Sequence, residues 1–201
     1  MPHDKVGRKT FKYVLTVVDV ASRFKAAEPL ATKNSDEVAQ AFQKIYKRGP
    51  LRWPKLLQVD PRREFMGAVS REMEKHGTTI RRGHFEVHRD QAIVERFNRT
   101  LTERLFQQQY AVEMRLTEGA RVVEWVARLP RVVAAINNQT NRLTGLKPAV
   151  AIQKQSVSAR PATFYSRPVG RNEKNSPCRN IGALSVPTRR VGRRQIGRAH
   201  V

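Results

Sequence analysis

Two carboxylates, Asp60 and Glu95, occupy positions in this chain where side chains able to do chemistry are often held. Asp60 ends an apolar run, residues 55–59, that is typical of a buried strand. Glu95 follows 35 positions later, in the expected first turn of a helix. If they lie close together, the two could supply hard oxygen ligands to Mg²⁺ and support phosphoryl transfer. Taken singly, each is more often a turn residue or a solvated partner of the helix dipole.

Polar and basic side chains surround the second carboxylate. Arg99 lies one helical turn after Glu95, so the two share a helix face. His88, Arg89 and Gln91 lie in the polar segment before the helix, which we expect to be a loop beside the site. These four residues are the candidate DNA contacts. The alternative is that each is a solvated surface group.

The elements that must position these residues follow from hydrophobic periodicity. Residues 13–20 are β-branched and apolar, which indicates a buried strand. Ser35 is the expected N-cap of a helix that Gly49-Pro50 ends. Pro130 should kink or split a long helix over residues 119–138. The remaining expected elements are strands at 23–29, 55–60 and 78–82, and helices at 67–76, 92–109 and from Pro148. This order predicts a mixed α/β sheet flanked by helices.

The chain divides into two parts by composition. Residues 1–155 hold the periodic pattern and form the expected core. From residue 156 to 201, Pro, Gly, Ser and Arg dominate and no apolar period survives, which predicts a disordered basic tail. The core carries a net charge of +13 and the tail +9, so the core is basic in its own right.

The total charge restricts the classes of partner. Lys and Arg number 39 against 17 acids, giving +22, which favours a nucleic acid partner. A single cysteine, Cys178, forms no disulfide framework, and without cysteine pairs a zinc module is excluded. The sequence has no signal peptide and no apolar stretch long enough to cross a bilayer. We therefore expect no membrane and no zinc partner, and a location in the nucleus or cytoplasm.

Four segments, in order, resemble the catalytic core of retroviral and LTR-retrotransposon integrases. Residues 59–65, Val-Asp-Pro-Arg-Arg-Glu-Phe, resemble the Asp-x-Gly-x-x-Phe segment around the second acid of that family. Residues 92–99, Ala-Ile-Val-Glu-Arg-Phe-Asn-Arg, resemble its Gly-x-x-Glu-Arg-x-Asn-Arg helix start around the third acid. Residues 13–24 resemble its second strand and hairpin, while Trp125, Asn137-Asn138 and residues 144–148 resemble its closing helix and loop. The resemblance runs from about residue 11 to residue 152.

The resemblance implies an RNase H-like mixed sheet flanked by helices and DNA strand transfer as the activity. In that family, three carboxylates hold two Mg²⁺ or Mn²⁺ ions. By position, Asp60 and Glu95 match the second and third acids and would be both catalytic residues and metal ligands, and Arg99 matches a DNA-contacting position. The implied partners are DNA and further copies of the chain in a homo-oligomer.

The first acid of the family has no clear counterpart. It belongs in the middle of the strand before residues 13–20, which is normally central to the sheet, and residues 1–7 lack an apolar strand. Asp4 lies at a suitable distance from Asp19 but in a polar context, and Asp19 lies on the following strand; both stay open as substitutes. Arg62 and Ala92 also replace two family glycines. We therefore expect the chain to start after the lost strand, leaving residues 13–20 at or near a sheet edge.

Three interpretations follow. The first is an integrase catalytic domain, a strand transferase by descent, that is inactive as this isolated chain. The second is a non-catalytic DNA-binding remnant held on DNA by charge alone. The third is an RNase H-like nuclease. A nuclease requires a complete carboxylate cluster, whereas a remnant would present Asp60 and Glu95 without a third partner.

Overall fold

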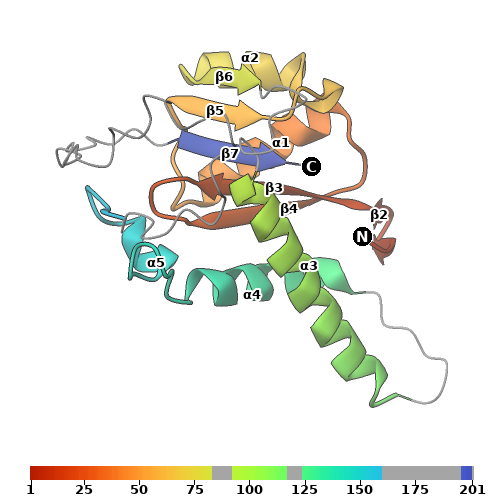
Figure 1. The fold of residues 1–201 in the computed structure, drawn as a ribbon. Helices are drawn as coiled ribbons and strands as arrows, with labels where there is room; N and C mark the ends of the chain where they lie inside the picture. The colour runs from red at the N-terminus through yellow and green to blue at the C-terminus, as the bar shows by residue number, and fades with distance from the viewer. Residues whose placement is uncertain (83–91, 117–123, 160–195, 201) are drawn as a thin grey trace, which may run out of the picture.

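The computed structural model describes residues 1–82, 92–116 and 124–159, together with the backbone of residues 196–200. Its main sheet has five strands in the order β4-β3-β7-β5-β6 (Figure 1). Their bounds are β3 Tyr13–Asp19, β4 Lys25–Leu30, β5 Leu56–Val59, β6 Thr79–Arg82 and β7 Ile196–His200. β3 is antiparallel to β4 and β7, whereas β5 is parallel to β6 and β7. The predicted mixed α/β sheet is confirmed.

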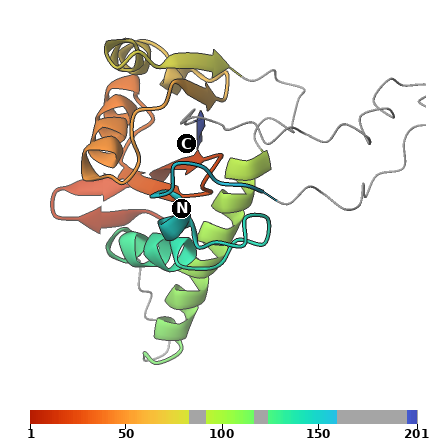
Figure 2. The same cartoon turned by 90° about the vertical axis from the view of Figure 1, so that its left-hand side faces the viewer.

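Helices cover both faces of this sheet (Figure 2). On one face, α1 (Ser35–Arg48) and α2 (Ala68–Lys75) pack in a core that includes Phe42 and Leu57. On the other face, α3 (Ala92–Glu113) and α4 (Trp125–Asn137) form a second core that includes Val18 and Phe97. The short α5 (Pro148–Ala151) and the 3-10 turn η1 (Arg63–Phe65) complete the described helices. The protein is a three-layer α/β/α domain.

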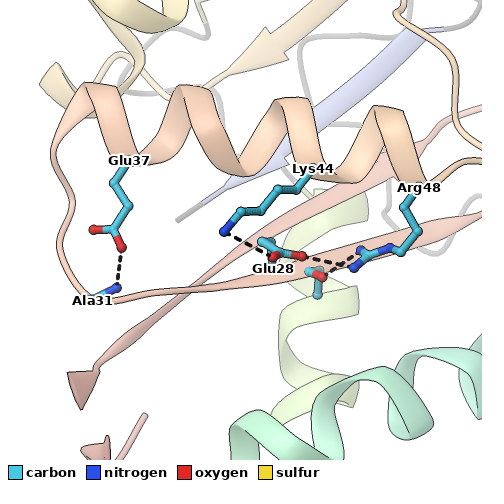
Figure 3. A network of polar contacts seen from close by, with 6 residues as sticks. Glu28, Ala31, Glu37, Lys44 and Arg48 are labelled. Atoms are coloured by element: carbon cyan, nitrogen blue, oxygen red, sulfur yellow. Dashed lines mark hydrogen bonds and ion pairs between the residues drawn. The ribbon is translucent and has the colours of Figure 1, made fainter. Parts of the chain in front are cut away.

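Polar contacts join both ends of α1 to β4 and to the residues that follow it (Figure 3). At the start of the helix, the Glu37 carboxylate accepts hydrogen bonds from the backbone N–H groups of Ala31, at 2.9 Å, and Thr32, at 2.7 Å. Towards its end, Arg48 Nη1 donates to Glu28 Oε2 at 3.0 Å. The expected N-cap at Ser35 is wrong by one residue: Asn34 is the N-cap and makes no side-chain capping bond. Glu37 instead fixes the entry of the chain into α1.

The first residues form a small antiparallel hairpin of their own, although the sequence pattern predicted no strand there. It pairs β1 (Asp4–Val6) with β2 (Lys9–Phe11), and Gly7 supplies the positive φ of 60° that the turn requires. The hairpin lies outside the main sheet. Its polar sequence gave no strand signal because it buries little apolar surface.

The assignment of residues 196–200 to a disordered tail is also wrong. These residues form β7, whose backbone pairs Gly197 with Asp19 on one side and with Leu57 on the other. β3 consequently has a strand on each side and is not an edge strand, contrary to expectation. Without β7, the facing edges of β3 and β5 would each expose a row of backbone N–H and C=O groups without partners. β7 pairs with both edges. Residues 160–195 and 201 lie outside the described residues, so the tail prediction stays a prediction for them.

The helices on the second face differ from expectation in detail. α3 runs to Glu113, beyond the expected end at Gln109. α4 is continuous from Trp125 to Asn137 and includes Pro130, so the proline does not split it. The expected first residues of that helix, 119–123, lie outside the described part of the chain. No helix in the described ranges is long and apolar enough to cross a membrane.

Candidate functional site

Asp60 lies directly after the carboxyl end of β5. Its side chain is 14% exposed, and its Oδ2 lies 3.9 Å from Nε of Arg62. On the neighbouring strand, Arg82 is paired with Val59, the residue before Asp60. Arg62, which stands where the integrase motif has a glycine, thus places its guanidinium within ion-pair distance of the Asp60 carboxylate. The end of β5 combines one largely buried acid with exposed arginines.

Glu95 lies in the first turn of α3, where its side chain is exposed. Its neighbours Val94 and Phe97 are buried in the core that covers β3. One turn further along, Asn98 Oδ1 accepts a hydrogen bond from Thr16 Oγ1 at 2.7 Å. This bond joins residues 82 positions apart and fixes the start of α3 over the middle of β3.

The strand register brings Asp60 to the same level of the sheet as Thr16. Thr16 pairs with His200 of β7, and Val59 pairs with Ala199. One residue further along each strand, Asp60 is level with His200 and hence with Thr16. Two strand spacings separate β3 from β5, roughly 10 Å. The Asn98 side chain bonds to Thr16. The start of α3 therefore packs on the sheet at the level of Thr16, which is also the level of Asp60.

The alternation of side chains along β5 is consistent with a shared face. Leu57 and Val59 belong to the core beneath α1. Because successive strand residues face opposite sides of the sheet, positions 58 and 60 belong to the other face, which α3 covers. We predict that the carboxylates of Asp60 and Glu95 lie within roughly 8 Å of each other, because two metal ions about 4 Å apart need ligands from one shared pocket. That separation, and the assignment of both as catalytic residues, stay predictions.

The candidate DNA contacts are placed unevenly. Arg99 is 82% exposed on α3, and its Nε donates to Glu103 Oε1 at 2.9 Å. An exposed ion pair of this kind is weak, so the guanidinium can exchange Glu103 for a phosphate at small cost. His88, Arg89 and Gln91 lie outside the described residues, and their role stays a prediction.

Neither open substitute for the first acid lies beside Asp60. The Asp4 carboxylate accepts a hydrogen bond from the backbone N–H of Val126 at 2.8 Å, at the start of α4. Asp19 Oδ2 accepts hydrogen bonds from the backbone N–H and the hydroxyl of Ser22. Asp19 is level with Leu57 through their common partner Gly197, three residues before Asp60, or about 10 Å along the strand. Asp4 thus bonds to the start of α4, and Asp19 bonds within the turn that follows β3.

The residues present do not reproduce the three-carboxylate metal set that the resemblance implies. In the described ranges, no group of three His, Cys, Asp or Glu side chains is gathered that could hold a metal ion. β7, which lies between β3 and β5, reads Ile-Gly-Arg-Ala-His and contributes no carboxylate. Among the described residues, Asp60 and Glu95 are thus not joined by a third acid in such a group, and their assignment as metal ligands stays a prediction.

Comparison with solved structures identifies the architecture. The catalytic core domain of BIV integrase matches with a TM-score of 0.54 at 18% identity, over 75% of this chain and 89% of that one. The HTLV-2 integrase catalytic core, solved with magnesium in a trimeric form, matches with a TM-score of 0.55 at 13% identity, over 74% and 89%. This chain has the integrase-core fold. The fold that the sequence motifs implied is thus confirmed.

A sequence comparison adds a second finding. A transposon-derived protein of Caenorhabditis elegans is 33% identical over 137 residues, which are 68% of this chain. The chain spans 44% of the length of that relative. No family model matches the chain. Together with the solved structures, this relative supports an integrase-like domain related to transposable elements.

Within the integrase-core fold, sequence reasoning missed two features that shape the site. The Thr16–Asn98 bond was not foreseen, although a threonine inside an apolar strand is the signal that could have indicated a polar contact. β7 carried no usable signal, because five residues with a glycine, an arginine and a histidine do not resemble a central strand.

Proposed function

We propose that this chain is a DNA-binding domain of transposable-element origin that does not carry out strand transfer by itself. The proposal rests on the sequence of the central strand, β7, which contains no acidic residue. The resemblance places the first catalytic acid in a central strand beside the one at residues 13–20. In this chain β7 is the strand between β3 and β5, and it has no carboxylate.

Two carboxylates are too few for the chemistry of this fold. Strand transfer requires charge on the attacking and the leaving oxygen to be stabilised together, which is the task of two ions on either side of the phosphate. Asp60 and Glu95 could hold one ion loosely. Arg62 beside Asp60 adds a competing cation at 3.9 Å. An RNase H-like nuclease needs the same complete cluster, so no observation favours that alternative. Mg²⁺ or Mn²⁺ use and homo-oligomer formation remain proposals by analogy.

Affinity for DNA follows from charge. The net charge is +22, of which +13 falls in residues 1–155. Lys and Arg side chains that neutralise phosphates release counterions, and the affinity then falls with salt by roughly 0.9 logarithmic units per contact for each tenfold rise in salt. Duplex DNA should therefore bind with a steep salt dependence and with little preference for sequence.

The binding experiment compares two proteins over a salt titration. In the variant, Arg189, Arg190, Arg193 and Arg194 are changed to glutamine, which leaves β7 and the core unaltered. We expect weaker binding with a shallower salt slope, but not its loss, because the charge of the core remains. Binding by the unchanged protein that is indifferent to salt would contradict the proposal.

The catalytic experiment tests the missing carboxylate directly. With Mg²⁺ or Mn²⁺ the chain should join no donor DNA ends. Ala199→Asp and His200→Asp each place a carboxylate on β7 near the level of Asp60, and successive strand residues face opposite sides of the sheet. One of the two should recover more strand transfer than Arg62→Gly does. Robust joining by the unchanged chain, abolished by Glu95→Gln, would overturn the proposal.

A further inference from the structure

A cavity lies beside the start of α3, the helix that carries Glu95. This cavity of about 250 Å³ is lined by residues from the end of β3 and the β3–β4 connection, the start of α3 and the loop after α4. Its cationic lining residues are Arg23, Lys25 and Arg96. Val18 and Phe97, buried in the core, form part of its apolar lining. None of the described residues that line it is acidic.

Lys25 is held in place by bonds to both its backbone groups. Its N–H donates to Asn137 Oδ1 at 2.9 Å, and Asn137 Nδ2 donates back to its carbonyl oxygen at 2.7 Å. Asn137 is itself 4% exposed, at the end of α4. The Lys25 ammonium donates to the carbonyl oxygen of Arg23 at 2.8 Å. The amine is thus pre-positioned in the cavity wall and does not extend freely into solvent.

The electrostatics of the cavity favour an anion. Burial and, secondarily, the charge of Arg23 lower the pKa of Lys25 from its usual 10.5 to about 8. Both causes make the protonated, charged form of Lys25 less stable. An anion bound among the three cations would offset this cost, and its binding would therefore be favoured. The apolar lining strengthens the attraction, because charges interact more strongly away from water. The first turn of α3 adds the positive end of a long helix dipole.

We propose that this cavity binds a phosphomonoester group, carried either by a free nucleotide or by the 5′ end of a nucleic acid strand. The guanidinium fork of arginine matches phosphate oxygens, and a terminal phosphate carries the charge that several cations balance. A cavity of about 250 Å³ is smaller than most drug-sized ligand sites. It accommodates the phosphate and the adjoining sugar, and it leaves the base outside.

This cavity is distinct from the site at Asp60 and Glu95. Arg96 follows Glu95 directly, and successive residues of a helix are turned by roughly 100°. The two sites therefore lie on adjacent faces of α3. The inference does not depend on the proposed DNA binding, since a free nucleotide tests the cavity while duplex DNA without terminal phosphates tests the proposed function.

The experiment titrates the full chain with inorganic phosphate, thymidine 5′-monophosphate and thymidine, using calorimetry and chemical-shift changes. The first two should bind and shift the resonances of residues that line the cavity, whereas thymidine should not. A 5′-phosphorylated single strand should bind more tightly than the same strand with a 5′-hydroxyl if the nucleic-acid end is the source. Equal binding of the two strands, with retained binding of the mononucleotide, assigns the free nucleotide instead.

Substitutions then locate the site. Arg96→Gln alters an exposed side chain and should weaken mononucleotide binding by about tenfold, the loss of one charge-assisted hydrogen bond. Lys25→Met should act similarly, and Lys25→Arg should retain binding. Lys44→Met, an exposed lysine on α1, is the matched control and should have no effect. Absence of phosphate and mononucleotide binding by the unchanged chain, or equal losses in the Lys44 control, would overturn the inference.

Discussion

The carboxylate of Asp4 accepts a hydrogen bond from the backbone N–H of Val126 at 2.8 Å, across 122 positions of the chain. A second bond runs beside it, from the indole N–H of Trp125 to the carbonyl oxygen of Pro2, also at 2.8 Å. The N-terminal hairpin thereby satisfies one of the amide groups at the start of α4 that have no partner within the helix. An acid that sequence reasoning considered for metal binding acts as a helix cap.

Replacing this cap should reduce stability. Asp4→Ala should lower the free energy of unfolding by about 1 kcal/mol, the usual worth of an N-terminal capping side chain. In a domain of this size that corresponds to a fall of about 2–4 °C in Tm. Glu74→Ala, which removes an exposed acid on α2, is the control. Equal melting temperatures for both variants would show that the Asp4–Val126 bond contributes nothing.

Disrupting β7 should affect the entire sheet. Gly197→Pro restricts the backbone of a residue that lies between Asp19 and Leu57, and a central strand does not accommodate proline. We expect a loss of about 1–3 kcal/mol, together with faster aggregation as strand edges open. Gly197→Ala keeps the N–H and should change little. Urea unfolding and light scattering measure both effects, and a Gly197→Pro protein as stable as its alanine counterpart would refute the role of β7.

The link between Thr16 and Asn98 should stabilise the start of α3. Thr16→Val keeps the β-branched shape and removes the donor, leaving Asn98 Oδ1 with one partner fewer at a half-buried position. The expected loss is about 1 kcal/mol of unfolding free energy, with faster amide exchange in the first turns of α3. Thr79→Val, at an exposed position of β6, serves as the control. Unchanged exchange in α3 would contradict this explanation.

Acid should weaken the attachment of α1 through Glu37. Burial alone would raise the pKa of this carboxyl, but hydrogen bonds from the Thr32 hydroxyl and from the N–H groups of Ala31 and Thr32 lower it below the usual 4.5. A lowered folded pKa means that the stabilisation is present above the unfolded pKa and is lost as pH falls through the folded value. Glu37→Gln should therefore be less stable than the unchanged protein at pH 7, and the difference should shrink below roughly pH 4. A difference that is constant from pH 7 to pH 3 would show that proton binding by Glu37 does not contribute.

Several features of this protein follow from local sequence alone. The apolar run before Asp60 fixes a strand, and the spacing of Val38, Phe42 and Ile45 fixes a helix with one apolar face. These elements bury one apolar face, so their apolar residues repeat with the period of a strand or a helix. That period can be recognised in the sequence before the fold is known. The motifs at residues 59–65 and 92–99 likewise lie at the carboxyl end of β5 and at the start of α3, as their composition indicated.

The tertiary structure decided the features that depend on long-range pairing. The hydrogen bond from Val126 to Asp4, the Thr16–Asn98 bond and the pairing of residues 196–200 each join segments with no local signature of the contact. A polar side chain or a short mixed strand gains its stabilisation only when a specific partner satisfies it. Sequence alone therefore determined the strands and helices that have a regular apolar period, but not β7. The pairing of distant backbone groups decided which strand lies beside Asp60 and that this strand carries no carboxylate.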